Sequence, residues 1–215
     1  MSDATTVERH AFHIYEGRLP LRVLGFSGSL RKHSYNTALL RVAQKLAPAG
    51  MTIEIYDLST IPMYNEDIRQ DSGYPTAAAQ LREDIRTADA VLIASPEYNR
   101  SVPAVLKNAI DWASRRPDQP FMDKPIAIMG VSNGALGAAF ANYHLRQIFV
   151  YLDARMLNGP EVMIGNAQLK FDDAGQLTDQ PTRDFVASHL QRLYALAISA
   201  DHTLIDRQRM VQTSA

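Results

Sequence analysis

The chain of 215 residues contains no cysteine, which excludes disulfides, thiolate metal sites and thiol nucleophiles together. A surplus of one charge is also lacking, because 22 Lys and Arg stand against 23 Asp and Glu, for a net charge of −1. A nucleic-acid interface carries a basic surplus gathered on one face. We therefore expect no nucleic-acid partner.

Long apolar runs are absent too, so we expect no membrane insertion. Residues 1–10 lack the basic-then-apolar order of a secretory signal. Together with the missing cysteines, this predicts a cytoplasmic protein. Its length and 46% apolar composition suit one domain with a sizeable core. We divide the chain into a polar N-terminal arm (1–20), a folded domain (21–200) and a polar C-terminal tail (201–215), and we expect no metal site.

The first notable stretch is residues 21–36, an apolar run that ends in a small, hydroxyl-rich loop and then opens a helix. The first N–H groups of such a helix, with its dipole, favour an anion. Ser29, Arg31 and Ser34 can donate hydrogen bonds to phosphate oxygens, and Asn36 can do so from the first helical turn. An ordinary strand-to-helix turn with Ser34 as N-cap fits equally well. Both interpretations stay open on this stretch alone.

Two familiar phosphate-binding motifs are missing. The Walker motif needs Gly-Lys-Ser/Thr at its end, and Lys32 is followed by His33. The dinucleotide fingerprint needs three glycines at a spacing that Gly25 and Gly28 do not give, although Asp57 stands where a ribose-binding acid is expected. A dinucleotide-binding dehydrogenase therefore fails on its glycine spacing.

The rest of the chain alternates between two apolar periods. A spacing typical of amphipathic helices predicts helices at 35–46, 76–87, 103–114, 138–152 and 182–198. Strands are predicted at the apolar run after residue 20, at 51–56, 89–94 and 125–131, and as a short segment within 155–163. Residues 58–70 read as a long loop and 171–175 as a hairpin-like excursion. This alternation predicts an α/β fold, a doubly wound five-stranded parallel sheet with helices on both faces.

Three loops of this fold leave the carboxyl ends of strands, at residues 27–36, 96–99 and 132–137. Ligands of doubly wound sheets bind at that edge, where the winding direction reverses. We therefore expect the three loops to converge on one site.

Motifs on these elements resemble those of a known family. They are GSLRKHSYN at 28–36, SPEYN at 95–99 followed by VP at 102–103 and LKNAIDW at 106–112, and YHLR at 143–146. Together they resemble the NADPH-dependent FMN reductase family, in particular its quinone and chromate reductase branch, over residues 21–197. The resemblance implies a flavodoxin-like fold, bound FMN, and reduction of quinones, flavins or similar acceptors by NADPH or NADH.

The resemblance also implies roles for individual residues. The FMN phosphate would be held by Ser29, Arg31, Ser34 and Asn36. The isoalloxazine would lie along Pro96, Glu97, Tyr98 and Asn99, and Ser132 would contact the ring or the ribityl chain. Hydride passes to the flavin itself, so we assign no catalytic side chain. Backbone amides of residues 97–99 suit the negative charge of reduced flavin, and we expect the Glu97 carboxylate to be solvated.

One position departs from the family pattern. The family commonly has an arginine after the glycine loop, where this chain has Phe140, so a preference for NADPH over NADH stays open.

The resemblance further implies a homodimer or homotetramer, with the helix over residues 140–152 as the candidate interface. The alternative function is a flavodoxin-like electron carrier without NAD(P)H chemistry of its own. Such carriers are usually strongly acidic, unlike this chain.

Overall fold

The computed structural model describes residues 20–213, with side chains described for residues 20–200. Apart from Pro20, the predicted N-terminal arm lies outside the described residues.

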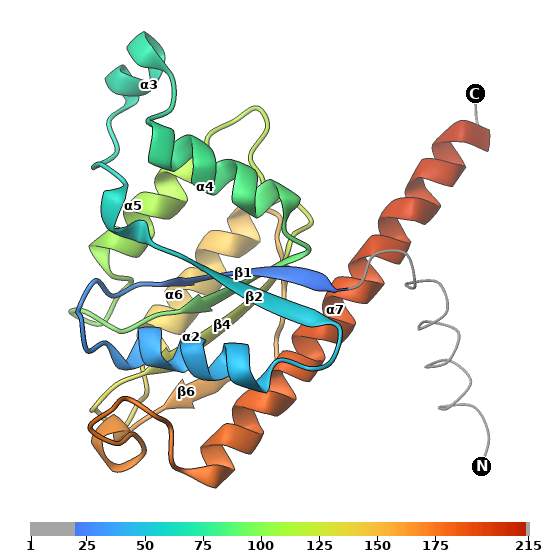
Figure 1. Ribbon diagram of the computed structural model, residues 1–215. Helices are drawn as coiled ribbons and strands as arrows, with labels where there is room; N and C mark the ends of the chain where they lie inside the picture. Colours follow the sequence, from blue (N-terminus) through green and yellow to red (C-terminus); the bar gives the residue numbers. More distant parts are fainter. Residues whose placement is uncertain (1–19, 214–215) are drawn as a thin grey trace, which may run out of the picture.

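Six parallel strands form one sheet: β1 (Leu21–Ser27), β2 (Met51–Tyr56), β3 (Ala90–Ala94), β4 (Pro125–Val131), β5 (Arg155–Met156) and β6 (Val162–Ile164). Their order is β2-β1-β3-β4-β5, and β6 pairs with β4 further along (Figure 1). The predicted flavodoxin-like order is confirmed, but the fifth strand is divided into two short segments. Pro160 lies between them, and proline has no N–H for a sheet ladder.

The α-helices are α2 (Tyr35–Leu46), α3 (Glu66–Ser72), α4 (Thr76–Thr87), α5 (Ala104–Ala113), α6 (Ala139–Tyr151) and α7 (Gln180–Thr213), with 3₁₀ turns η1 (Leu58–Thr60) and η2 (Ala167–Leu169). Helices α2 and α4 begin and end at the predicted residues. No helix within residues 20–213 is both long and apolar enough to cross a membrane.

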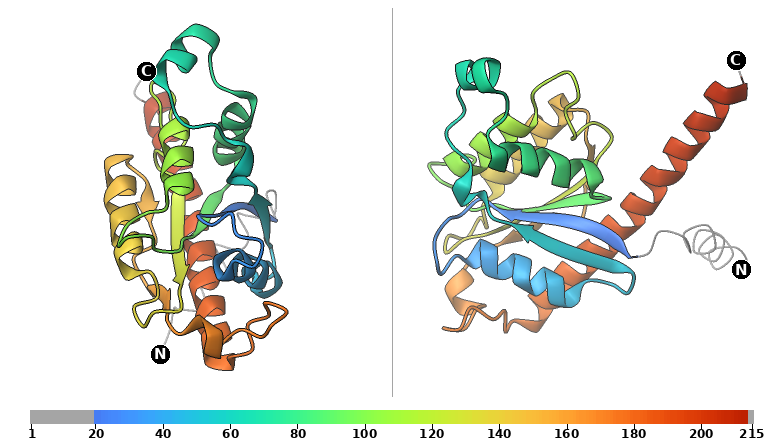
Figure 2. Two further views of the ribbon diagram at one scale, coloured as in Figure 1. Left: turned by 90° about the vertical axis from the view of Figure 1, so that its left-hand side faces the viewer. Right: turned by 45° about the horizontal axis from the view of Figure 1, so that its top comes forward.

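The sheet lies between two helical layers (Figure 2). Helices α2 and α7 pack on one face, and α4, α5 and α6 pack on the other. Alternate residues of β4 enter the two cores: Ala127, Met129 and Val131 face α2 and α7, whereas Ile126 and Ile128 face the opposite layer. Because both faces are covered, the central strands are apolar throughout.

Two predicted boundaries are wrong. The expected loop over residues 58–70 contains η1 and most of α3, a helix with no buried residue and hence no apolar period to reveal it. The closing helix, expected to end at residue 198, continues to Thr213 through most of the predicted tail. Residues 199–213 contain neither glycine nor proline to stop it. Figure 1 shows this end of α7 extending beyond the rest of the domain.

The segment that follows η1 is fastened to α5. The Asn108 side chain accepts a hydrogen bond from the Tyr64 N–H at 2.7 Å and donates one to the Pro62 carbonyl at 2.9 Å. Trp112 is fully buried, and its Nε1 donates to the same carbonyl at 2.8 Å. Trp112 is thus a packing residue.

Helix α7 buries one histidine. His189 is fully buried, and its Nδ1 lies 2.8 Å from the Pro160 carbonyl oxygen, to which it donates. Its Nε2 has no hydrogen-bond partner in the described part of the chain. Burial lowers the pKa of His189 from 6.5 to about 4, because the charged imidazolium would lose its hydration.

This histidine should make the fold sensitive to mild acid. The unfolded chain takes up a proton near pH 6.5 and the folded chain only near pH 4, so stability is lost as pH falls through this window. Between pH 7 and pH 4.5 the free energy of unfolding should fall by about 2 kcal/mol from this group. Urea unfolding at both pH values measures it. The variant His189→Asn keeps a hydrogen-bond donor but does not titrate, so its free energy of unfolding should decrease less between the two pH values. An equal decrease in the variant and the wild type would assign the effect to other groups.

Candidate functional site

The three loops at the carboxyl edge of the sheet meet one another. We call residues 28–34 the first loop, 95–101 the second and 132–138 the third. The Gly28 N–H donates to the Ala94 carbonyl at 2.9 Å, and the Ser95 N–H donates to Met129 at 2.9 Å. A Cβ added to Gly28 would lie 3.2 Å from Pro96 Cδ, so the first and second loops are in contact. A Cβ added to Gly130, at the end of β4, would lie 2.8 Å from the Gly137 carbonyl oxygen and 3.2 Å from the Ser95 carbonyl oxygen, so the third loop lies beside the second. The three loops therefore lie together, as predicted, and their use for one ligand stays a prediction.

The first loop ends in a capped helix start. Ser34 Oγ accepts from the Thr37 N–H at 3.3 Å, so Ser34 is indeed the N-cap of α2. Ser27 Oγ accepts from the Ser29 N–H at 3.2 Å and from the Thr37 hydroxyl at 3.0 Å. Our reading of the sequence missed Thr37, although its place three residues after the N-cap marks it as a capped position.

Capping leaves several donors of this region unused. No described residue accepts a hydrogen bond from the backbone N–H of Leu30, Lys32, His33, Tyr35 or Asn36. These donors surround the N-terminus of a twelve-residue helix, where the dipole favours negative charge. Helix capping by Ser34 and anion binding are therefore compatible, and the donor set fits a phosphate.

Two predicted phosphate ligands line this loop. Arg31 Nη2 donates to the His33 carbonyl at 3.0 Å, which holds the exposed guanidinium beside the free N–H groups. Ser29 is buried, and its Oγ lies 3.4 Å from the Arg31 N–H, so the hydroxyl proton remains available to an acceptor.

Asn36 has a structural contact beside its predicted role. Its side chain is buried, its Nδ2 donates to the Val131 carbonyl at 3.0 Å, and its Oδ1 accepts from the Val131 N–H at 3.1 Å. The side chain therefore fastens α2 to the end of β4. Because Nδ2 carries a second N–H, the contact with phosphate stays a prediction, and the backbone N–H of Asn36 is a further available donor.

The second loop forms a tight turn. Tyr98 and Ser101 exchange backbone hydrogen bonds of 3.1 and 3.0 Å, and the two residues between them are both left-handed, Asn99 at φ 50° and Arg100 at φ 58°. This is the pattern of a two-residue hairpin turn, in which Asn is favoured. The turn leaves Tyr98 and Asn99 exposed, whereas Pro96 is buried.

Glu97 acts on a neighbouring helix. Helix α6 begins after Ala138, which is left-handed at φ 68° and offers no side-chain cap. Glu97 Oε2 fills this place by accepting from the N–H groups of Phe140 at 2.8 Å and Ala141 at 3.2 Å. The expectation of a solvated carboxylate was wrong, because the first N–H groups of α6 require an acceptor and Glu97 supplies it.

Two further contacts fasten the second loop to α6. The Arg100 guanidinium lies 4.9 Å from the centroid of the Phe140 ring. Ser101 Oγ lies 3.0 Å from His144 Nδ1. Together with the Glu97 carboxylate, these contacts hold the second loop and the first half of α6 as one unit.

The third loop packs against β6. Ser132 is half-buried and its Oγ donates to the Gly134 carbonyl at 3.2 Å. Gly137 has φ 58°, and an added Cβ would lie 2.4 Å from the Met163 carbonyl carbon, so only glycine fits. The loop therefore runs close to the sheet, with Ser132 at the carboxyl end of β4.

Metal-binding side chains are not gathered in the described residues, where no group of three His, Cys, Asp or Glu could hold an ion. Asp111, for example, pairs with Lys107 at 2.7 Å one helical turn away.

A parallel sheet of this order, with unpaired N–H donors at its first loop, defines a flavodoxin-like α/β protein. The sequence model of the NADPH-dependent FMN reductase family matches residues 21–169. The chain is 56% identical over 173 residues to an NAD(P)H-dependent FMN reductase of Pseudomonas aeruginosa, covering 80% of this chain and 93% of that protein. It is 47% identical over 172 residues to a quinone reductase of Escherichia coli, and this match covers 79% of this chain and 92% of that protein.

A solved structure agrees. FerB, a flavoenzyme NAD(P)H:(acceptor) oxidoreductase from Paracoccus denitrificans, matches with a TM-score of 0.76 and 34% identity, covering 84% of this chain and 98% of that one. The chain belongs to the NADPH-dependent FMN reductase family. It is an FMN-dependent oxidoreductase that uses NAD(P)H as donor.

Removing the cap from α6 should destabilise the protein. Glu97→Ala leaves the Phe140 and Ala141 N–H groups without this acceptor and should lower the free energy of unfolding by about 1 kcal/mol in urea. Glu97→Gln keeps an acceptor oxygen, so its free energy of unfolding should decrease less than that of Glu97→Ala. The matched control is Glu83→Ala, whose carboxylate pairs with Arg86 on the surface of α4. An equal loss in Glu97→Ala and Glu83→Ala would contradict the capping role.

Proposed function

We propose that the protein passes hydride from NAD(P)H to FMN held at the three loops, and that the reduced flavin then reduces quinones, free flavins or metal oxyanions such as chromate. The observation that carries this proposal is the set of five unused backbone N–H groups around the start of α2. The family assignment supports it, as do the names of the P. aeruginosa and E. coli relatives for the flavin and quinone acceptors.

In this proposal the first loop holds the FMN phosphate. Ser29, Ser34 and the backbone N–H groups donate to its oxygens, and Arg31 balances its charge with a guanidinium that is always positive. Asn36 holds these donors in place through Val131 and adds its own N–H. The support is the dense set of donors, which suits a dianion better than a neutral ligand.

The second and third loops hold the ring system. Pro96, Glu97, Tyr98 and Asn99 lie along the isoalloxazine in this proposal, and Ser132 contacts the ring or the ribityl chain. When bound, FMN supplies the atom that accepts hydride, and the protein supplies orientation and backbone N–H groups. A loop fastened to α6 at three points supports this role, because its amides keep a fixed direction.

The same helix is our proposed subunit interface. Its exposed apolar side chains include Tyr143, Val150 and Tyr151, which are 50%, 68% and 76% exposed. Large exposed apolar groups gathered on one element favour association. We propose a homodimer or homotetramer formed through α6, in the cytoplasm, where NAD(P)H is available.

The purified protein should show the visible absorption of a bound flavin. Anaerobic NADPH or NADH should bleach it, and a quinone added next should restore it, since the flavin hands its electrons on. An electron carrier would bleach negligibly without a partner reductase. Absence of FMN, even after reconstitution, would contradict the proposal.

Arg31 should matter more than Glu97 for holding FMN. Arg31→Ala removes a charge-assisted contact to the phosphate and should raise the dissociation constant of FMN roughly tenfold or more, as measured by the quenching of flavin fluorescence. Glu97→Ala should raise it less, because Glu97 acts through the backbone of the second loop. Equal constants for the two variants would refute the phosphate role of Arg31.

A further inference from the structure

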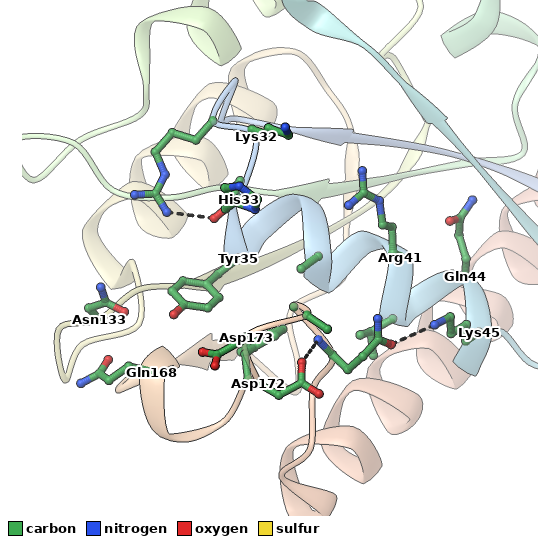
Figure 3. Close-up of a pocket in the computed structure, with 18 residues that line it drawn as sticks. Lys32, His33, Tyr35, Arg41, Gln44, Lys45, Asn133, Gln168, Asp172 and Asp173 are labelled. Atoms are coloured by element: carbon green, nitrogen blue, oxygen red, sulfur yellow. Dashed lines mark hydrogen bonds between the residues drawn. The ribbon is translucent and has the colours of Figure 1, made fainter.

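A groove of about 790 Å³ runs along the outer face of α2, beside the first loop (Figure 3). Ala38 and Val42 form part of its lining, and a hairpin over residues 171–177, closed by the Phe171–Leu177 bridge, provides the opposite wall. The hairpin-like excursion predicted at residues 171–175 is thus confirmed, and it lies beside the first loop. Tyr35 packs on Phe171 with their ring centroids 5.2 Å apart, which adds an aromatic surface.

The charges around this groove are unequal. Five basic residues line it, namely Arg31, Lys32, His33, Arg41 and Lys45, against the two acidic residues Asp172 and Asp173. In the described part of the chain, no hydrogen bond or ion pair engages the side chains of Lys32, His33 and Arg41. Asp172 accepts from the Gln176 N–H at 2.7 Å, and Lys45 donates to Gln176 at 2.9 Å. The groove therefore carries unneutralised positive charge.

The two sides of the groove differ in chemistry. Figure 3 shows Lys32, His33 and Arg41 on the first loop and α2, and Asp172 and Asp173 on the hairpin, on the other side of α2 in this view. Cationic side chains suit a phosphate, whereas carboxylates accept hydrogen bonds from ribose hydroxyls. A ribose phosphate therefore matches both sides better than an inorganic anion does.

The groove borders the proposed flavin site. Arg31, Ser34 and Asn133, from the first and third loops, belong to its lining. A ligand in the groove would thus lie next to the proposed FMN phosphate site.

We propose that this groove binds the adenosine 2′-phosphate end of NADPH, with Lys32, His33 and Arg41 on the phosphate, Asp172 or Asp173 on the one free hydroxyl of that ribose, the 3′-hydroxyl, and Tyr35 beside the adenine. The proposal rests on the proposed function, which provides NAD(P)H as the donor. It gives the chain a source of NADPH preference that does not depend on an arginine at the position of Phe140.

Arg41→Ala tests the proposal, since Arg41 lies about two helical turns beyond the N-cap and outside the first loop. With a quinone as acceptor and FMN-loaded protein, the KM for NADPH should rise about fivefold, and about tenfold in Lys32→Ala/Arg41→Ala. The KM for NADH should change by less than twofold, because NADH lacks the 2′-phosphate. The matched control is Arg192→Ala, an exposed arginine of α7 outside the groove that has no side-chain partner in the described residues.

Calorimetry gives a readout without turnover. Adenosine 2′-monophosphate should bind the FMN-loaded wild type, and its affinity should fall about tenfold in the double variant, whereas adenosine 5′-monophosphate and inorganic phosphate should bind more weakly to the wild type. Equal binding of inorganic phosphate, or equal KM changes for NADPH and NADH, would overturn the proposal. Wild type that oxidises neither nucleotide would refute the proposed function, while the calorimetry would still decide for or against the groove.

Discussion

The site depends on the two hydrogen bonds between the Asn36 side chain and the Val131 backbone, which join residues 95 positions apart. They fix the first turn of α2 against the end of β4, and with it the direction of the free N–H groups around the first loop. A buried amide that pairs with both backbone groups of one residue leaves the two segments little freedom to move, because breaking these hydrogen bonds would leave buried polar atoms without partners. The set of free N–H groups therefore takes its shape from a contact within the protein.

The second loop follows the same principle with different groups. Its hairpin turn holds Asn99 and Arg100 in left-handed conformations, which are sterically unfavourable for a residue such as Arg100. The contacts to α6 offset this unfavourable energy by fixing both ends of the turn. Since α6 is also the proposed subunit interface, association through this helix and the geometry of the proposed flavin-binding loop involve the same element. In this proposal, a change at the interface also changes one support of the second loop.

The central strands and helices were predictable because both faces of the sheet are covered, whereas the flavodoxin-like fold was implied by the family resemblance. Strand β3 is an unbroken apolar run, and α2 shows its buried side at a regular spacing, so both stand out in the sequence. Helix α3 has no buried side and left no such pattern. The partners of Glu97 and Asn36 lie 43 and 95 residues away, and no local pattern predicts contacts over such separations. The loops of the site were thus predictable, and the contacts that hold them were not.

The divided fifth strand has a consequence for the solubility of the protein. A parallel sheet exposes unpaired backbone groups at its outermost strand, and a long, flat edge there recruits strands from other copies of the chain. Here that edge consists of segments of only two and three residues, separated by a stretch that contains Pro160. So short and interrupted an edge is a poor template for strand addition. This edge is thereby protected against strand addition, whereas the opposite edge of the sheet is β2, a continuous strand of six residues.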